Sequence, residues 1–310
     1  MSGSYSMYNV ILLCTSGSET LSQKLVNSVY SSMDGQNLSW LCDDEAVCFD
    51  VEKKSTAHYE IWSQLQRIKI DMVFQKKENH FKSLLLADMD STMIEQECID
   101  ELADMCGVGS EVKKITTRTM NGELGFHDAL NERVSLLAQC PSSIVEQVLE
   151  KRITFRPGGK TLVSTMKANG AYTALVSGGF TSFSIPIGTN LGFDEQHANI
   201  LVEENGVFTG KVAEPILGKN EKVNQLNRLV KERGLMHSDV LAVGDGANDL
   251  GMLAIAGIGV AMHAKPIVAE KCDIVINHCD LSSLLSVSNT HLRAHETKAN
   301  LVCRLLLEKK

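Results

Sequence analysis

Two aspartates spaced by one residue, Asp88 and Asp90, follow an apolar run and precede two hydroxyl side chains. Residues 84–87 have the composition of a buried strand, and the chain continues as Asp-Met-Asp-Ser-Thr. Where such a strand opens into a loop, both carboxylates can converge on one ligand, an arrangement that suits phosphoryl transfer. An Asp-x-Asp pair also caps helices and fills turns, so the pair carries little weight by itself.

Two further strand-like runs end in residues that could bind a phosphate. Residues 171–176 lead into Ser-Gly-Gly at 177–179, and residues 240–243 lead into Gly-Asp-Gly-Ala-Asn-Asp at 244–249. Lys222 lies between them on a helical stretch. In an open parallel sheet, ligands bind outside the carboxyl ends of the strands. The three runs are therefore expected to meet at one crevice.

Each of these residue types has a task in the hydrolysis of a phosphate monoester, where an anion must attack an anionic centre. We expect Asp88 to attack phosphorus and form an aspartyl-phosphate. Asp90 is expected to protonate the leaving alkoxide and then to take a proton from water. The Ser177 hydroxyl and the Gly178 amide can donate to phosphate oxygens, and Lys222 supplies positive charge to the phosphate and to Asp88.

Several carboxylates around one phosphate need a cation, and hard oxygen donors beside a phosphate favour Mg²⁺. Asp245 could be a turn residue when taken alone. As a third acid at a strand end, it is better interpreted as a metal ligand. The sequence therefore predicts a magnesium-dependent site.

The chain resembles the haloacid dehalogenase superfamily of phosphohydrolases, whose four short motifs match residues 88–92, Ser177, Lys222 and residues 244–249 in order. Within it the chain resembles the phosphoserine phosphatases, because longer segments recur. These segments are Asp-Met-Asp-Ser-Thr at 88–92, Glu-Cys-Ile-Asp-Glu-Leu-Ala at 97–103, Arg-Val-Ser-Leu-Leu at 133–137, Val-Ser-Gly-Gly-Phe at 176–180 and Gly-Asp-Gly-Ala-Asn-Asp at 244–249. The match covers residues 81–286.

The resemblance implies a reaction and a set of metal ligands. The reaction is the hydrolysis of O-phospho-L-serine to L-serine and phosphate, the last step of serine biosynthesis. Mg²⁺ would bind Asp88, the backbone carbonyl of Asp90, and Asp245. Asp249 would be a further ligand or a carboxylate beside the ligands, and Asn248 would orient the catalytic groups.

Substrate recognition is implied to come from the cap that this family inserts after the first strand. Glu97 matches the glutamate that binds the substrate ammonium, and Arg133 matches the arginine that can hold the carboxylate with two parallel hydrogen bonds. Met120 and Phe126 match apolar positions that shield the substrate. Taken singly, the first two could be a surface ion pair and the last two helix core.

The alternation of strand and helix signals predicts an α/β fold with a doubly wound, mostly parallel sheet of the Rossmann type. We assign the catalytic core to residues 81–98 and 155–286, and a helical cap to residues 99–154. Asn205-Gly206 joins two alternating runs and predicts a β-hairpin.

Residues 1–80 are predicted to form a small α+β domain. The expected elements are strands at 8–14 and 46–51, helices at 18–33 and 58–70, and a polar linker at 75–79. This domain loosely resembles amino-terminal extensions related to the amino-acid-sensing ACT domain. Two interpretations stay open: a ligand-binding domain, and a domain that serves stability or homodimer formation without a ligand.

Composition limits the partners and the compartment. Acidic residues outnumber basic ones, 38 to 30, and no block of Lys and Arg is present, which argues against nucleic acid as a partner. The chain shows neither a secretion signal nor an apolar run long enough to span a membrane, so a soluble, cytoplasmic protein is expected. Nine cysteines without a Cys-x-x-Cys pair predict reduced thiols rather than disulfides or a zinc site.

The last 24 residues, 287–310, look foreign. Residues 287–297 and 301–310 resemble the conceptual translations of a sequencing adapter and of the primer that follows it, and 298–300 fall where a variable index would lie. A genuine amphipathic helix is the alternative. We therefore end the predicted fold at Ser286 and expect residues 287–310 to form a disordered or spurious helical tail.

Two competing functions stay open. The same chemistry could serve another small phosphomonoester, such as phosphothreonine, or transfer phosphate to an alcohol such as homoserine. From a different class, residues 1–80 could make the chain a regulatory amino-acid-binding protein with an inert core. The intact set of catalytic residue types argues against the second.

Overall fold

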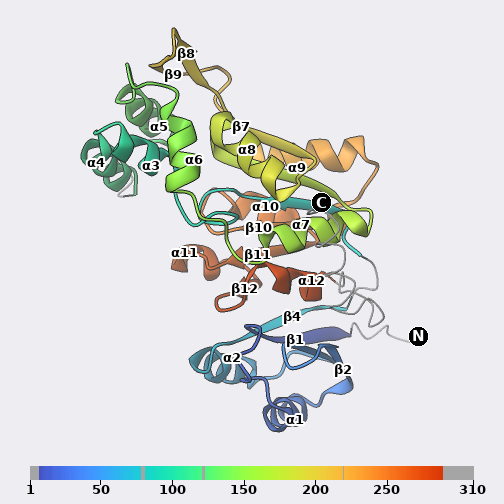
Figure 1. The fold of residues 1–310 in the computed structure, drawn as a ribbon. Coiled ribbons are helices and arrows are strands. Elements are labelled where there is room, and N and C mark those ends of the chain that lie inside the picture. Colours follow the sequence, from blue (N-terminus) through green and yellow to red (C-terminus); the bar gives the residue numbers. More distant parts are fainter. Residues whose placement is uncertain (1–6, 78–80, 121–122, 219, 289–310) are drawn as a thin grey trace, which may run out of the picture.

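Two main sheets organise the molecule (Figure 1). The structure, a computed structural model, describes residues 7–77, 81–120, 123–218 and 220–288, and the side chain of Met120 is not among the parts described. One sheet is antiparallel and precedes residue 78; the other is parallel and contains the three strand ends identified above. The predicted fold class is confirmed.

The amino-terminal sheet has the strand order β2-β3-β1-β4. Its elements are β1 (Tyr8–Cys14), α1 (Gln23–Ser32), β2 (Gln36–Cys42), β3 (Ala46–Val51), α2 (His58–Arg67) and β4 (Ile70–Lys76). Both faces of the central strand β1 are buried, because Val10 and Leu12 pack with α1 and α2 while Ile11 and Leu13 join the core of the parallel sheet. The strands predicted at 8–14 and 46–51 are confirmed.

The remaining elements of this sheet differ from the prediction. β2 is missed because its side chains are mostly exposed or half-buried and lack a clear apolar alternation. β4 is missed as well, because the prediction places its first residue at the end of a helix and its last two in a linker, and assigns no element to residues 71–74. The first helix begins later than predicted, where the Ser22 hydroxyl accepts a hydrogen bond from the Leu25 N–H. The second ends at Arg67, because Lys69 takes a positive φ of 60° that ends the helical path.

The parallel sheet has the order β12-β11-β10-β5-β6-β7. Its strands are β5 (Leu84–Ala87), β6 (Tyr172–Phe180), β7 (Glu195–Asn199), β10 (Val240–Gly244), β11 (Ile258–Met262) and β12 (Ile274–Ile276). Its helices are α7 (Gly159–Ala168), α8 (Thr181–Leu191), α9 (Glu221–Glu232), α10 (Leu250–Ile255), α11 (Pro266–Ala269) and α12 (Leu284–Val287), with 3₁₀ turns at His237–Asp239 and Leu281–Ser283. Two separate apolar clusters contain residues of β5, one on each face, as a doubly wound sheet requires.

Four helices inserted after β5 form the cap, which stands beside the strand ends in Figure 1. They are α3 (Cys98–Met105), α4 (Gly109–Met120), α5 (Phe126–Ser135) and α6 (Ile144–Lys151). The predicted hairpin is confirmed as β8 (Leu201–Glu204) and β9 (Val207–Val212). The hairpin is hydrogen-bonded to the cap through Phe208. The Gln139 N–H donates to the Phe208 carbonyl, and the Phe208 N–H donates to the Cys140 carbonyl.

The cysteine prediction is wrong at one pair. Cys106, which ends α3, and Cys140, which follows α5, form a disulfide across the cap, with their Cα atoms 5.9 Å apart. The fold of the cap brings together residues 34 positions apart, which sequence spacing does not reveal.

The core also continues past the expected end at Ser286. Val287 ends α12 and is fully buried, Ser288 is buried as well, and the Gln75 amide donates to the Val287 carbonyl at 2.9 Å. The rest of the suspected adapter segment, 289–310, lies outside the described residues. Among the helices that are described, none combines the length and the apolar character needed to cross a bilayer.

A buried aspartate is one of the contacts that join the amino-terminal sheet to the parallel sheet. Asp71 lies in β4, is fully buried, and accepts three backbone N–H bonds at 2.9–3.0 Å, which come from Asn277, His278 and Cys279 directly after β12. β4 and β12 consequently lie side by side (Figure 1).

Candidate active site

Three adjacent strands bring their motifs to one edge of the parallel sheet. Ala87 at the end of β5 is paired with Val243 of β10 on one side and Leu175 of β6 on the other. Asp88 directly follows, and its N–H donates to the Val243 carbonyl at 3.0 Å. The motifs beginning at Ser177 and Gly244 therefore flank Asp88, as the strand-end argument predicts.

One buried lysine joins two aspartates at this edge. Lys222 Nζ lies 2.5 Å from Oδ1 of Asp88 and 2.5 Å from Oδ1 of Asp249. Backbone amides hold both carboxylates, because Met89 N–H donates to Asp88 and Gly246 N–H donates to Asp249. Lys222 is 4% exposed, which excludes a lysine on a solvated helix face.

Asp245 completes a group of three buried carboxylates. Oxygens of Asp88, Asp245 and Asp249 lie within 4.8 Å of one another. The Thr92 hydroxyl donates to Asp245 at 3.1 Å, and Lys265 Nζ lies 4.0 Å from its other oxygen. Such close, buried negative charges are unfavourable without a further cation. Their hard oxygen donors fit Mg²⁺.

The titration behaviour of the group points the same way. Burial, followed by the charge of Asp249, raises the pKa of Asp88, while Lys222 opposes both. Burial also raises the pKa of Asp245 to about 6. Burial disfavours the Lys222 ammonium, but Asp249 and Asp88 outweigh it and raise the lysine pKa. The cluster is therefore short of positive charge, which a divalent cation would supply.

Asp90 lies between the Ser-Gly-Gly loop and the start of the cap. It accepts hydrogen bonds from the Cys98 N–H at 3.1 Å and the Ser177 hydroxyl at 3.4 Å. Burial, reinforced by the charge of Glu97, raises the pKa of Asp90 to about 7. A carboxyl that titrates near neutral pH can both donate and accept a proton in one catalytic cycle. Gly179 N–H fixes the serine by donating to its oxygen at 2.9 Å.

The cap closes over the Ser-Gly-Gly loop. Phe126, the first residue of α5, lies so near Gly178 that a Cβ at Gly178 would be 3.7 Å from its ring. Phe126, Gly178 and Ser177 line a small pocket together with Lys222 and Asn248. The side chain of Met120, at the end of α4, lies outside the described residues.

Glu97 lies where the core continues into the cap, and Arg133 lies within the cap on α5. Glu97 is the N-cap residue of α3 and accepts a hydrogen bond from the Ser91 hydroxyl at 2.9 Å. Arg133 is half-buried on α5; burial lowers its pKa, opposed by the charges of Asp100 and Glu97. The Glu97 charge is also felt by Asp245, so it lies near both the core cluster and Arg133.

Sequence reasoning assigned no role to three nearby residues. Thr92 is the second hydroxyl residue of the first motif, and its position directly after the two aspartates could have indicated a role in the site. Lys265 follows β11, so the same strand-end argument could have found it. Asp100 lies three residues after Glu97 on α3, and its buried Oδ1 has no hydrogen-bond partner among the described residues.

Residues 85–254 match the family model of the haloacid dehalogenase-like hydrolases, a match that spans more than half of the chain. The chain belongs to this family. The prediction that the protein is an enzyme, a hydrolase, is thereby confirmed.

Known members of the hydrolase family are similar to it over most of its length. A phosphoserine phosphatase of Archaeoglobus fulgidus is 41% identical over 226 residues, which are 72% of this chain and 65% of that protein. A solved phospho-aspartyl intermediate analogue of phosphoserine phosphatase is 42% identical, with a TM-score of 0.61 over 67% of this chain and 99% of that one. The probable phosphoserine phosphatase of Vibrio cholerae, in its unliganded form, is 30% identical, with a TM-score of 0.76 over 93% of this chain and 87% of that one.

Proposed function

We propose that this hydrolase cleaves O-phospho-L-serine to L-serine and phosphate by way of an aspartyl-phosphate on Asp88. The observation that carries the proposal is the buried contact of Lys222 with Asp88 and Asp249. The charge of Glu97 acts both on Asp245 of this site and on Arg133 of the cap. The names of the relatives support the choice of substrate.

In the first step, a carboxylate oxygen of Asp88 attacks phosphorus and the bond from phosphorus to the serine oxygen breaks. The Asp90 carboxyl, with its raised pKa, gives its proton to that leaving oxygen. The Lys222 ammonium orients the attacking carboxylate and offsets the charge of the phosphate. The Ser177 hydroxyl and the Gly178 amide donate to phosphate oxygens.

In the second step, the Asp90 carboxylate takes a proton from a water molecule as that water attacks the phosphorus. The bond between phosphorus and Asp88 breaks, which releases phosphate and restores the aspartate. Asp90 is then protonated again and ready for the next substrate. Asn248, beside Lys222 in the pocket, is proposed to keep the catalytic groups in orientation.

Asp88, the backbone carbonyl of Asp90, Asp245 and Asp249 are the proposed ligands of Mg²⁺. When bound, the ion offsets the charge of the phosphate and of the carboxylates around it. The short supply of positive charge in this cluster supports the assignment.

The cap is proposed to select the amino acid part of the substrate. Glu97 would accept hydrogen bonds from the ammonium and Arg133 would bind the carboxylate. Phe126 and Met120 would exclude water from the closed site. In this division of labour, residues 81–98 and 155–286 perform the chemistry, residues 99–154 together with Glu97 recognise the substrate, and residues 1–80 are accessory.

Phosphate release from O-phospho-L-serine, with and without Mg²⁺, tests the proposal. Asp88→Asn should abolish the activity, whereas the exposed control Asp43→Asn should not change it. Arg133→Ala should raise KM by about 10- to 100-fold, the cost of one charged hydrogen-bonded contact. Its matched control is Arg152→Ala, an exposed cap arginine that pairs with Asp104.

The substrate part of the proposal is tested separately by comparing phosphoserine, phosphothreonine and a sugar phosphate. If Asp88-dependent hydrolysis of another ester exceeds that of phosphoserine, the chemistry holds and the substrate assignment is wrong. If Asp88→Asn retains activity, the mechanism itself is refuted.

A further inference from the structure

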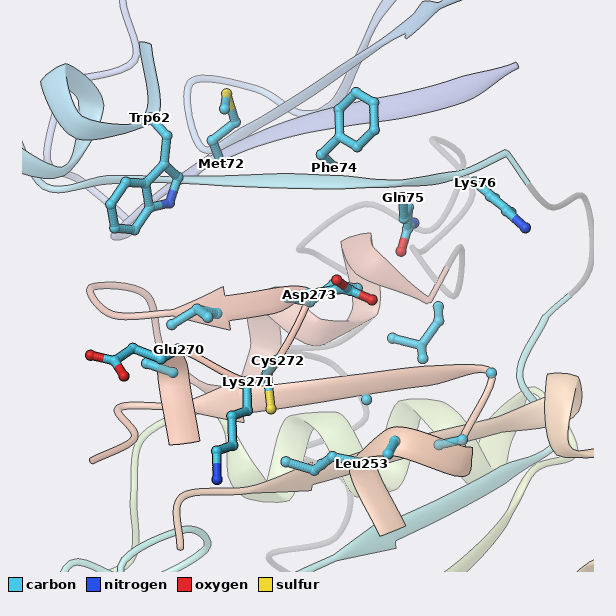
Figure 2. A pocket seen from close by; sticks show the side chains of 18 of the residues that line it. Trp62, Met72, Phe74, Gln75, Lys76, Leu253, Glu270, Lys271, Cys272 and Asp273 are labelled. Carbon is cyan, nitrogen blue, oxygen red and sulfur yellow. The ribbon is translucent and has the colours of Figure 1, made fainter. Parts of the chain in front are cut away.

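A large pocket separates the amino-terminal domain from the parallel sheet (Figure 2). Its volume is about 790 Å³, within the range of pockets that bind small molecules. α2 and β4 form one wall, and α10, the start of β11 and residues 269–275 form the other. These are the amino ends of β11 and β12, whereas the active site lies at the opposite, carboxyl ends of the strands.

The wall on the amino-terminal side is rich in aromatic rings. Tyr59 stacks on Trp62 with ring centroids 5.8 Å apart, whereas the Phe74 ring, which stacks on Tyr8 at 4.8 Å, points from β4 away from the parallel sheet (Figure 2). Tyr59 is 75% exposed, so its ring is available to a ligand. Trp62 extends from α2 toward the opposite wall (Figure 2). Flat, apolar ligands pack favourably against such rings.

Two polar atoms of the same wall have no hydrogen-bond partner among the described residues. They are Oε1 of Gln75 and Nδ1 of His58, both buried. The amide of Gln75 donates to the Val287 carbonyl, which fixes its orientation and leaves the oxygen as an acceptor. Gln75 points from β4 toward the parallel sheet (Figure 2). A buried acceptor is costly until a donor reaches it, so a ligand with an N–H group is favoured.

The charged side chains of the pocket favour an anion. Among the residues that line the pocket, three exposed lysines face two exposed acids. The lysines are Lys54, Lys76 and Lys271, and the acids are Glu270 and Asp273. Two of these lysines stand on the aromatic wall, and Lys54 Nζ lies 5.5 Å from the Phe74 ring. An anionic group on a flat ligand would therefore meet positive charge on that wall.

We propose that this interdomain pocket binds a small aromatic anion that carries an N–H donor. Its ring packs on Tyr59 and Trp62, its N–H reaches Gln75 Oε1, and its anionic group lies near Lys54 and Lys76. Purine nucleotides and indole carboxylates share this chemistry. The site is separate from the active site and does not depend on which phosphate ester the enzyme hydrolyses.

Calorimetric titration of the full chain tests the proposal with two pairs of probes. Adenosine 3′,5′-cyclic phosphate, a diester that a phosphomonoesterase site does not take as substrate, is compared with adenosine. Indole-3-acetate is compared with indole-3-acetamide. At least one anion should bind with a Kd below about 1 mM, and its neutral partner about tenfold more weakly.

Variants then locate the binding. The double variant Lys54→Glu, Lys76→Glu should weaken binding of the anion by about tenfold, and so should the single variant Gln75→Leu. Ala254→Trp, which fills the pocket from an exposed position on α10, should abolish binding. Lys24→Glu, an exposed lysine of the same domain outside the pocket, is the matched control and should change nothing. Phosphatase activity checks that each variant is folded. The proposal is overturned if neither anion binds, if the neutral partners bind equally well, or if Ala254→Trp binds like the unaltered chain.

Discussion

Replacing Gly179 with alanine should disable the general acid while leaving the nucleophile in place. A Cβ at this position would lie 2.8 Å from Asp90 Oδ2 and 3.1 Å from the Ser177 hydroxyl oxygen. The first distance is shorter than a carbon–oxygen contact tolerates, and the second is tight, so Asp90 must shift. Asp90 is held by the Cys98 N–H as well, so it cannot move away without losing a hydrogen bond.

The size of the effect follows from the role of Asp90. General acid catalysis contributes about 100- to 10,000-fold to a rate, so the kcat for phosphoserine should fall by at least about 100-fold, or about 2.7 kcal/mol in the barrier. Asp88 and Lys222 lie farther from the new methyl group and keep their contact. Attack on phosphorus should therefore survive when the leaving group needs no proton.

Two substrates separate these effects. With p-nitrophenyl phosphate, whose nitrophenolate leaves without protonation, Gly179→Ala should lose about tenfold or less in the rate of the first nitrophenolate release, measured as a pre-steady-state burst, whereas the second step, which needs Asp90 as a base, slows for both substrates. Gly125→Ala is the matched control, because a Cβ there meets no atom closer than 3.6 Å. Thermal unfolding of each variant checks the fold. An equal loss of the first-turnover rate with both substrates, in a folded variant, would refute the assignment of Asp90 as the acid.

Three further outcomes are expected. Lys222→Met should abolish activity. It should also lower the free energy of unfolding, measured in urea, by about 3–5 kcal/mol, because two buried aspartates lose their counter-charge. Adding Asp249→Leu to this variant should restore part of the stability. Burial lowers the pKa of His58 from 6.5 to about 4, so as the pH falls the unfolded chain takes up this proton before the folded chain does. The free energy of unfolding should therefore be highest above pH 6.5 and decline as the pH falls toward 4. Urea titrations at several pH values should show less of this decline in His58→Gln. Reducing the Cys106–Cys140 disulfide should cost about 3–4 kcal/mol, from the entropy of a loop of 34 residues, and thermal unfolding of Cys106→Ser should not respond to the reductant.

The active-site edge could be predicted from the sequence because its signals are local. Apolar runs that end in Asp, Ser-Gly-Gly and Gly-Asp-Gly predict buried parallel strands, and neighbouring parallel strands place their carboxyl ends at the same edge of the sheet. The hairpin followed in the same way from Asn205-Gly206, where both residues adopt a positive φ.

The features that escaped prediction depend on tertiary neighbours. β2 is an edge strand whose exposed side chains carry no apolar period, and its pairing with β3 alone makes it a strand. The disulfide of Cys106 with Cys140 exists because the cap helices fold back on each other.

The hydrogen bonds between Asp71 of β4 and the amides after β12 have a consequence for the edges of the two sheets. β4 and β12 are the terminal strands of their respective sheets, and each would otherwise offer unpaired backbone groups to a strand of another chain. By accepting the amides that follow β12, Asp71 keeps each edge covered by the other domain. If a cut at residue 78 separated the two sheets, β4 and β12 would each become an uncovered edge, so we expect the separated fragments to self-associate more than the intact chain.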